Sequence, residues 1–339
     1  MAQSILKLDS VDVSALESYR EKFALDILTG LSEPRKSIPS IYHYDAEGSR
    51  LFNKITELPE YYLTRCEIET LKRNIDRIAG YMKSESINLI EFGPGDGNKT
   101  RILIEHFLNQ GLKFQYIPID ISYSALDELH QAFKKSYPKL ELKGLVADYF
   151  SGIKWLNNEY DRKNVVLFLG SNIGNFNQAR SKLFLRNLWN HLNDGDIAII
   201  GFDLKKDIDL LLRAYNDSQG VTAEFNLNLL KRINRELAGE FDISNFRFFA
   251  TYDVFSGAME SYLVSLEKQE VIIGEIGKSF HFDPWEPIHT EYSYKYLESD
   301  ILDLAKDTGF ILKENLYDEE KYFVNSVWEV NKPHATSEN

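Results

Sequence analysis

The segment INLIEFGPGDGNKT, residues 87–100, decides how this chain folds. An apolar run leads into Glu91, and a helical pattern begins at Thr100. Three glycines lie between them at alternating positions: Gly93, Gly95 and Gly97. Glycine permits positive φ angles and lets a ligand approach the backbone closely. The segment predicts a strand, a glycine turn and a helix that bind a nucleotide-like ligand, although such turns also join strands to helices for geometric reasons alone.

The spacing of the glycines discriminates between nucleotides. A dinucleotide fingerprint needs a glycine three residues after Gly95, where this chain has Asn98. Pyrophosphate binding, and with it a nicotinamide dehydrogenase, is therefore disfavoured. A carboxylate at Glu91 would repel phosphate but attract a sulfonium or an amine. The segment thus favours S-adenosylmethionine.

Composition restricts the remaining classes of function. The 339 residues, 43% of them hydrophobic, suffice for one large or two modest domains. The net charge of −13 and the absence of a basic run longer than two residues predict no nucleic-acid partner. No apolar run reaches membrane-spanning length and no signal peptide is recognisable, so we expect a cytoplasmic protein without a membrane partner. A single cysteine, Cys66, and seven scattered histidines predict no disulfide and no metal site.

Helices alternate with apolar strands from about residue 67 onward. The strands are expected at 87–92, 114–121, 140–146, 165–171 and 197–204, and the helices at 67–83, 100–110, 123–136 and 177–192. This alternation predicts an α/β fold with a doubly wound parallel sheet. A further helix at 295–307 and two closing strands predict an antiparallel hairpin at the sheet edge. A parallel sheet that ends in such a hairpin is the usual Rossmann-like layout of class I methyltransferases.

Two parts of the chain depart from the alternation. The N-terminal segment is helical and then rich in tyrosine, and residues 205–293 combine helices with antiparallel hairpins. We therefore expect a methyltransferase domain at 65–204 and 294–331, and a substrate-binding domain at 1–64 and 205–293. Residues 332–339 are expected to be a disordered tail.

Two aspartates follow successive strands. Asp120 ends the second strand, where a carboxylate can accept both hydroxyls of a ribose. Asp148 follows the third, where it can accept from an adenine amino group while Tyr149 or Phe150 packs on the ring. Either aspartate alone is more often a turn or cap residue. Their joint placement at strand ends favours cofactor binding.

Longer blocks carry a family resemblance. They are YDAEGSRLFNKITELPEYYLTR at 44–65, EFGPGDGNKT at 91–100, FLGSNIGNF at 168–176, AYNDSQGVTAEFN at 214–226 and IHTEYSYKY at 288–296. Over nearly its whole length the chain resembles the bacterial histidine-specific, S-adenosylmethionine-dependent Nα-methyltransferases of ergothioneine biosynthesis. The resemblance implies methylation of free L-histidine at its α-nitrogen, up to trimethylhistidine (hercynine), with S-adenosylhomocysteine as the second product.

The resemblance also implies the site residues. Its cofactor contacts fall on Gly93, Lys99, Asp120, Asp148 and Tyr149. Its substrate contacts fall on Tyr61, Asn175, Tyr215, Glu291 and Ser293, with Tyr44 as a further pocket residue. Asn175 and Tyr215 can bind a carboxylate, and Glu291 and Ser293, at i and i+2 on one strand face, can hold an imidazole N–H. Tyr44, Tyr61 and Asn175 would position the substrate, and no residue is identified as the proton acceptor.

Two alternatives stay open at this point. The acceptor could be a tryptophan-type amino acid, with Ser261 and Tyr262 lining its side-chain pocket. The chain could also be a catalytically silent S-adenosylmethionine-binding protein. In either case we expect a monomer with a small-molecule amino-acid ligand.

Overall fold

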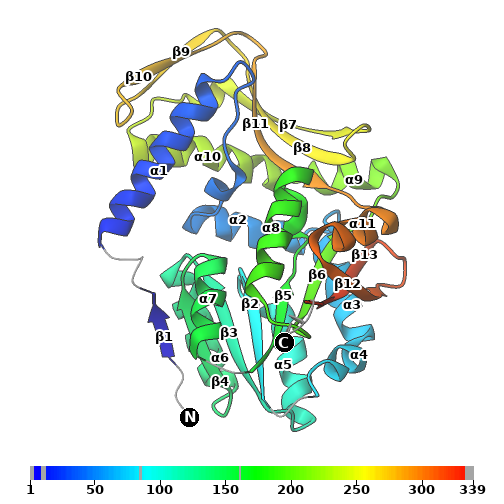
Figure 1. Ribbon diagram of the computed structural model, residues 1–339. Coiled ribbons are helices and arrows are strands. Elements are labelled where there is room, and N and C mark those ends of the chain that lie inside the picture. Colours follow the sequence, from blue (N-terminus) through cyan, green and yellow to red (C-terminus); the bar gives the residue numbers. More distant parts are fainter. Residues whose placement is uncertain (1–3, 9–12, 84–85, 160–161, 333–339) are drawn as a thin grey trace, which may run out of the picture. The chain divides into compact units, whose positions relative to one another are not determined.

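The chain divides into two compact units (Figure 1). The computed structural model describes residues 4–8, 13–83, 86–159 and 162–332. The first unit comprises Met1–Asp12, Cys66–Leu204 and Tyr296–Asn339, and the second comprises Val13–Arg65 and Lys205–Lys295. The predicted tail, 332–339, lies outside the described residues except for Lys332.

The first unit is built on an eight-stranded sheet with the order β1-β4-β3-β2-β5-β6-β13-β12. Its strands are β1 (Ser4–Lys7), β2 (Ile87–Phe92), β3 (Phe114–Asp120), β4 (Glu141–Val146), β5 (Lys163–Phe168), β6 (Ile197–Asp203), β12 (Phe310–Tyr317) and β13 (Phe323–Val330). Strands β1 to β6 run parallel, and β13 is antiparallel to both β6 and β12. The predicted parallel sheet with a closing antiparallel hairpin, the class I methyltransferase layout, is confirmed.

Strand β1 corrects one predicted boundary. The sequence assigns residues 1–64 to the second domain, whereas Ser4–Lys7 pairs in parallel with β4 at the edge of the main sheet (Figure 1). The strand has only four residues and none of its side chains is fully buried. Such a short edge strand carries too little apolar periodicity to be recognised from sequence.

The helices of the first unit precede or follow its strands along the chain. They are α3 (Tyr62–Arg73) from Cys66 onward, α4 (Ile75–Gly80), α5 (Asn98–Asn109), α6 (Tyr123–Ser136), α7 (Tyr149–Glu159), η2 (Asn172–Asn175), α8 (Gln178–His191) and α11 (Glu298–Thr308). The single helix predicted at 67–83 is two helices, because Asn74 leaves helical geometry at φ −112° and ψ 16°. Its side-chain amide donates instead to the carbonyl oxygens of Thr70 and Tyr317.

The second unit places two antiparallel sheets around helix α10. Its elements are α1 (Val13–Ser32), η1 (Ser40–His43), α2 (Ala46–Glu57), α9 (Ile208–Tyr215), α10 (Val221–Leu237), η3 (Ile243–Asn245), β7 (Phe246–Asp253), β8 (Ala258–Ser265), β9 (Gln269–Ile273), β10 (Lys278–Phe282) and β11 (Pro287–Tyr294). The sheets have the orders β11-β8-β7 and β10-β9. One apolar core joins α1, α10 and both sheets through Phe23, Ile27, Leu229, Ile233, Leu263, Val271 and Phe282.

A short turn separates α9 from α10. Asp217 accepts hydrogen bonds from the backbone N–H groups of Val221 (2.9 Å) and Thr222 (2.8 Å), and so satisfies donors in the first turn of α10. Gly220 supplies the left-handed turn that the chain needs there, at φ 75°. Within the described residues, no helix is long and apolar enough to cross a membrane.

Candidate functional site

The glycine turn follows β2 at the carboxyl end of the parallel strands. All three glycines have positive φ angles, 60° at Gly93, 56° at Gly95 and 71° at Gly97. The Gly93 N–H donates to the carbonyl oxygen of Ile119 on β3 at 3.0 Å, which holds the turn beside the end of that strand. In parallel α/β sheets, ligands bind at this edge, next to the point where the strand order reverses.

The glycines differ in the space around them, which gives a matched pair of variants. A Cβ on Gly97 would lie 2.4 Å from Leu129 Cδ1 and 2.8 Å from Phe133 Cε2, whereas no heavy atom lies within 4 Å of a Cβ on Gly95. Positive φ is unfavourable for alanine at both positions. We expect urea unfolding to show a loss of about 1 kcal/mol for Gly95→Ala and about 2 kcal/mol for Gly97→Ala, which also forces overpacking. Equal losses would contradict this account.

Glu91 anchors the flanks of the turn. Its carboxylate is buried and accepts hydrogen bonds from Thr100 Oγ1 of α5, at 2.5 Å, and from the Tyr116 hydroxyl of β3. Burial raises the pKa of Glu91 to about 7, although these hydrogen bonds act in the opposite direction. The sequence predicts a carboxylate that attracts a sulfonium or an amine. The structure instead shows it bound by two protein donors that connect β2 to its neighbours.

Lys99, a predicted cofactor contact, is part of a second polar link. Its Nζ lies 2.5 Å from Oε2 of Glu67, whose side chain is buried. The same carboxylate accepts the backbone N–H of Gly170, at 2.8 and 3.0 Å to its two oxygens. Lys99 and Glu67 therefore hold the loop that follows β5. An ammonium group has three donor hydrogens, so the ion pair leaves Lys99 able to donate to a ligand.

Asp120 ends β3 and Asp148 follows β4, as predicted, but their surroundings differ. Asp120 accepts the Ser122 N–H at 2.8 Å, and burial raises the pKa of its carboxyl above the usual range despite the backbone hydrogen bonds it receives. Asp148 is exposed and accepts from Ser151 Oγ and from the backbone N–H groups of Phe150 and Ser151. Burial would raise its pKa, but these donors outweigh burial and lower it. Asp148 thus caps α7. The Asp120 carboxylate accepts fewer hydrogen bonds from the protein than the Asp148 carboxylate does.

Tyr149 completes the predicted cofactor group. Its ring stacks on Phe92 with centroids 4.4 Å apart and planes 12° from parallel. A Cβ on Gly93 would lie 3.1 Å from the Tyr149 hydroxyl oxygen, so the turn and the tyrosine require a glycine there. An acceptor-only carboxylate at Asp120, an aromatic ring at Tyr149 and a side-chain-free backbone at Gly93 suit a nucleoside such as that of S-adenosylmethionine.

Asn175 also lies in the first unit, in the short helix η2. The turn that leads into η2 is fixed by Ser171, which has a left-handed backbone and whose Oγ accepts the Asp203 N–H at 3.0 Å. The hydroxyl of Tyr296 donates to the carbonyl oxygen of Ile173 within η2, at 3.3 Å. The Asn175 side chain is partly exposed. Asn175, a predicted positioning residue, therefore lies in a turn that hydrogen bonds hold next to the strand ends.

The other predicted substrate contacts lie in the second unit, where a buried lysine joins two of them. The hydroxyl oxygens of Tyr215 and Ser293 are 2.7 Å apart. Lys295 Nζ donates to the Tyr215 hydroxyl at 2.8 Å and to Ser293 Oγ at 2.9 Å. Tyr215 is at the end of α9, and Ser293 and Lys295 are two residues apart at the end of β11. Three residues from two segments that are distant in sequence thus form one polar cluster.

A β-bulge at Thr290 determines the direction of Glu291. In the register of β11 with β8, His289 opposes Tyr262 and Glu291 opposes Ser261, so Thr290 is an extra residue on its strand. Residues directly opposite each other share a sheet face. Glu291 therefore shares a face with Ser261 and, two residues on, with Ser293. Tyr262 points to the other face with His289, which corrects the expectation that it lines one pocket together with Ser261.

Glu291 is the carboxylate on this face that is available to a ligand. Among the described residues, none donates a hydrogen bond to its side chain, which is partly exposed. Burial raises the pKa of Glu291 to about 7, while the Lys295 ammonium acts in the opposite direction. A desolvated carboxylate without a protein donor favours binding of a ligand N–H.

Tyr44 and Tyr61 belong to an aromatic cluster of the second unit. Tyr44 is 41% exposed, and its ring meets Phe52 and Phe225 edge-on at 5.6 and 5.7 Å between centroids. Tyr61 is buried and contacts Phe52 and Tyr215, each at 6.3 Å. The cluster therefore connects Tyr61 to the Tyr215 end of the polar group. Tyr44 joins this cluster through Phe52, whose ring both tyrosines contact.

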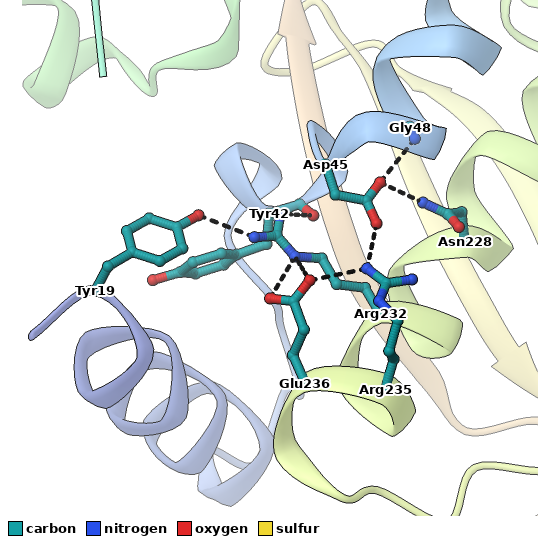
Figure 2. A network of polar contacts seen from close by, with 8 residues as sticks. All are labelled: Tyr19, Tyr42, Asp45, Gly48, Asn228, Arg232, Arg235 and Glu236. Carbon is teal, nitrogen blue, oxygen red and sulfur yellow. Dashed lines mark hydrogen bonds and ion pairs between the residues drawn. The ribbon is translucent and has the colours of Figure 1, made fainter. Parts of the chain in front are cut away.

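Figure 2 shows a buried arginine, Arg232, that binds Tyr42, two residues before Tyr44 in the chain. Arg232 of α10 donates to the carbonyl oxygen of Tyr42 at 2.9 Å, to the Tyr19 hydroxyl at 3.1 Å and to Glu236 through Nε. Its guanidinium also lies within 6 Å of the Tyr42 ring centroid, at 5.9 Å. A buried guanidinium needs such compensation, because its desolvation is otherwise costly.

Asp45 closes the same network on the other side of Tyr44. Its carboxylate accepts from the Gly48 N–H at 2.7 Å, from Asn228 Nδ2 at 2.8 Å and from Arg235 Nη2 at 2.6 Å (Figure 2). These donors outweigh the effect of burial and lower its pKa. Since the neighbours of Tyr44 on both sides are bound to α10, the backbone at Tyr44 is well defined.

Sequence reasoning did not identify three of the supporting residues: Glu67, Arg232 and Lys295. Glu67 and Arg232 lie on helices, where a charged residue is ordinarily read as solvent-facing. Lys295 could have been found, because it continues the alternation of Glu291 and Ser293 along one strand face in IHTEYSYKY.

Comparison with known proteins identifies the family of this chain. The profile of a family described as histidine-specific, S-adenosylmethionine-dependent methyltransferases matches residues 23–330. The histidine N-alpha-methyltransferase of Mycobacterium tuberculosis (strain CDC 1551 / Oshkosh) is 35% identical over 273 residues, which cover 80% of this chain and 83% of that protein. The protein of the same name from Mycolicibacterium smegmatis is 33% identical over 304 residues, covering 90% and 94%.

A more distant relative is named for a different acceptor. The 4-dimethylallyltryptophan N-methyltransferase of Claviceps purpurea is 30% identical over 173 residues, which cover 50% of each chain. The family profile and the two histidine N-alpha-methyltransferases extend much further along the sequence. The chain belongs to the family of histidine-specific, S-adenosylmethionine-dependent methyltransferases.

Proposed function

We propose that this protein transfers methyl groups from S-adenosylmethionine to the α-nitrogen of free L-histidine, up to trimethylhistidine. The observation that carries the choice of acceptor is Glu291. It is a desolvated carboxylate without a donor among the described residues, and it shares a strand face with Ser293. A carboxylate and a hydroxyl together suit an imidazole, which offers one N–H and one ring nitrogen. An indole would present one N–H and leave the second polar group unpaired.

We assign the proposed roles by chemistry. Gly93, Lys99, Asp120, Asp148 and Tyr149 would hold the methyl donor, which supplies an activated methyl group when bound. Asn175 and Tyr215 would bind the carboxylate of histidine, and Glu291 and Ser293 its imidazole. Tyr44 and Tyr61 would border the α-amino group. Their phenol oxygens and ring faces are neutral, so they can hold an amine without favouring its protonated form as a carboxylate would.

Positioning and exclusion of water would then supply most of the rate enhancement. The α-amine must lose a proton before it attacks, and α-amino groups have pKa values near 8 in peptides and higher values in free amino acids. At mildly alkaline pH a fraction of the amine is already neutral, so the proposal does not require a dedicated strong base. Holding the reacting nitrogen about 3–3.5 Å from the methyl carbon removes much of the entropic barrier.

The proposal is tested by an acceptor panel. The purified protein is incubated with isotope-labelled S-adenosylmethionine and each free amino acid in turn, and products are analysed by mass spectrometry. We expect label in histidine alone, ending in a product with three added methyl groups. Preferential labelling of tryptophan or a tryptophan derivative would refute the choice of acceptor. Cofactor binding without labelling of any amino acid would refute the proposed activity itself.

A further inference from the structure

A threonine hydroxyl bonds across the β-bulge that directs Glu291. Thr290, the extra residue of the bulge, is 1% exposed, and its Oγ1 donates to the carbonyl oxygen of Ser261 at 3.1 Å. Ser261 is the residue of β8 that opposes Glu291. The hydroxyl therefore links the extra residue of β11 to the point on β8 where regular pairing resumes.

The same hydroxyl is bonded to helix α10 through Asn226. Thr290 Oγ1 lies 2.9 Å from Oδ1 of Asn226, whose side chain is also buried. The amide nitrogen of Asn226 donates to the carbonyl oxygen of Thr222 at 3.0 Å, one turn earlier in α10, which fixes the orientation of the amide. A hydroxyl has a single proton, and that of Thr290 faces two acceptor oxygens, one from β8 and one from α10.

Asn226 is itself held by the segment that carries Tyr44. Nε2 of His43, a fully buried residue, lies 3.3 Å from Oδ1 of Asn226. The His43 ring stacks on Phe225, the residue of α10 next to Asn226, with centroids 4.8 Å apart and planes 17° from parallel. Asn226 thus bonds to the residue directly before Tyr44 and to the residue directly before Glu291.

This buried polar chain consists of His43, Asn226 and Thr290, and tight packing alone does not require it. Polar groups lose hydration when they are buried, and apolar groups of the same shape often replace a hydrogen-bonded pair at little cost in stability. Hydrogen bonds add direction, because a fully bonded buried network specifies one arrangement of the elements that it joins. Here one of the joined groups is the extra residue of a strand.

The bulge decides which face of the sheet carries Glu291. In a regular ladder that continues from the first residues of β11, Glu291 would oppose Glu260, which lies on the other face. A shift of one residue in register moves a side chain to the opposite face of a sheet. Glu291 would then leave the face that it shares with Ser293. Bulges next to binding sites commonly redirect a side chain in this way.

We propose that Thr290 is a positioning residue, anchored by Asn226, that holds the bulge and so keeps the Glu291 carboxylate directed toward the substrate imidazole. Thr290 acts through Glu291 and does not touch the substrate. The inference rests on the proposed function, in which Glu291 accepts the imidazole N–H. It adds the determinant of that contact, a hydroxyl and an amide that keep the strand irregular.

A double-mutant cycle tests the inference. Thr290→Val removes the hydroxyl at nearly constant shape and Thr290→Ser keeps it, and each is made in the wild-type protein and in Glu291→Gln. Thr308→Val is the control, because Thr308 is a buried threonine of α11 whose Oγ1 donates to the carbonyl oxygen of Leu304. Steady-state kinetics gives kcat and the KM of histidine, and calorimetry with S-adenosylhomocysteine shows that each protein is folded.

We expect Thr290→Val to raise the KM of histidine about tenfold, with kcat and S-adenosylhomocysteine affinity within about twofold of wild type. Thr290→Ser should stay within about twofold in KM because it keeps the donor, and Thr308→Val should leave KM unchanged. In the Glu291→Gln background, Thr290→Val should change KM by less than about twofold, because the carboxylate that it positions is gone. A threonine that only stabilises the fold would not lose its effect in this way.

Asn226→Ala tests the anchor in the same cycle. It should raise the KM of histidine about threefold, less than Thr290→Val, because the Thr290 hydroxyl keeps the carbonyl oxygen of Ser261 as an acceptor. Part of this rise should disappear in the Glu291→Gln background. A rise of the same size in both backgrounds would show that Asn226 does not act through Glu291, and anchoring by Asn226 would be wrong.

The remaining outcomes separate the inference from the proposed function. If Thr290→Val leaves the KM of histidine unchanged, or raises it equally in both backgrounds, the inference is wrong. If the wild-type protein methylates histidine and Glu291→Gln has the wild-type KM, the inference is also wrong, while methylation of histidine stands. A wild-type protein that methylates no amino acid would overturn the proposed function and the inference together. Should Thr290→Val fail to fold, Thr290→Ala, which also lacks the hydroxyl, takes its place with the same expected results.

Discussion

Replacing Asp120 with asparagine is expected to weaken binding of S-adenosylhomocysteine about 100-fold, which corresponds to about 2.7 kcal/mol. Asp120 is at the end of β3, and the N–H of Gly93 donates to the carbonyl oxygen of the preceding residue, Ile119. A carboxylate can accept from both hydroxyls of a ribose, whereas asparagine turns an NH₂ group toward one of them. Because burial has already desolvated Asp120, each hydrogen bond that it forms there counts more than it would in water.

Isothermal titration calorimetry measures this effect directly. Asp127→Asn is the matched control, because Asp127 lies on helix α6 of the same unit and has no predicted role in binding. We expect its affinity to stay within twofold of the wild-type value. Asp148→Asn should lie between the two, since the Asp148 carboxylate is already bonded to Phe150 and Ser151. An Asp120→Asn protein that is folded and binds with unchanged affinity would show that the ribose is held elsewhere.

The parallel sheet could be predicted because its strands are buried on both faces. Every residue of β2 and β6 is buried, so their sequences are mostly apolar and stand out from the helices between them. The edge strand β1 and the break between α3 and α4 could not be predicted in this way. Strand β1 is short and partly exposed, and the break at Asn74 depends on a carbonyl oxygen of Tyr317, more than 200 residues away.

Two kinds of sequence signal predicted the candidate site: residues at the ends of strands, and the sequence blocks shared with the family. The position of Asp120 at the end of β3 could be predicted, because the apolar run that marks the strand stops there, and in parallel α/β sheets ligands bind at this edge. The direction of Glu291 was less secure, because simple alternation would put His289 on its face. The extra residue at Thr290 turns His289 to the opposite face, and a β-bulge leaves no clear mark in a single sequence.

Polar contacts between residues that are distant in sequence could not be predicted. Arg232 and Tyr42 are 190 residues apart, and Lys295 and Tyr215 are 80 apart. Each pair depends on how two elements pack, which no local pattern encodes. These residues nevertheless determine how Tyr44 and Tyr215 are held, so the geometry of the predicted substrate contacts depends on groups that the sequence does not single out.

Replacing Glu291 with glutamine is expected to raise the KM of histidine about 100-fold while S-adenosylhomocysteine binding changes less than twofold. Glutamine keeps the shape and one acceptor oxygen but loses the charge, and it adds an NH₂ group on a face where Lys295 already supplies donors. Steady-state kinetics with varied histidine measures the change. Glu260→Gln is the control, because Glu260 opposes Tyr292 on the other face of the same sheet. Equal effects of the two variants would contradict a direct role for Glu291.

The pH dependence of histidine binding provides a second readout of the same residue. Burial raises the pKa of Glu291 to about 7, so the group is ionised above that pH and neutral below it. The ionised form accepts the imidazole N–H, and therefore wild-type affinity for histidine, measured in the presence of S-adenosylhomocysteine, should fall as the pH drops through about 7. Glu291→Gln has no group to titrate at this position and should lose that step, retaining only the dependence due to histidine itself.

Lys295 is the charged neighbour that acts on Glu291, so Lys295→Met should move the step to higher pH, because the ammonium no longer favours the ionised carboxylate. A step that persists unchanged in Glu291→Gln would mean that another group controls it, and that the imidazole is recognised without this carboxylate.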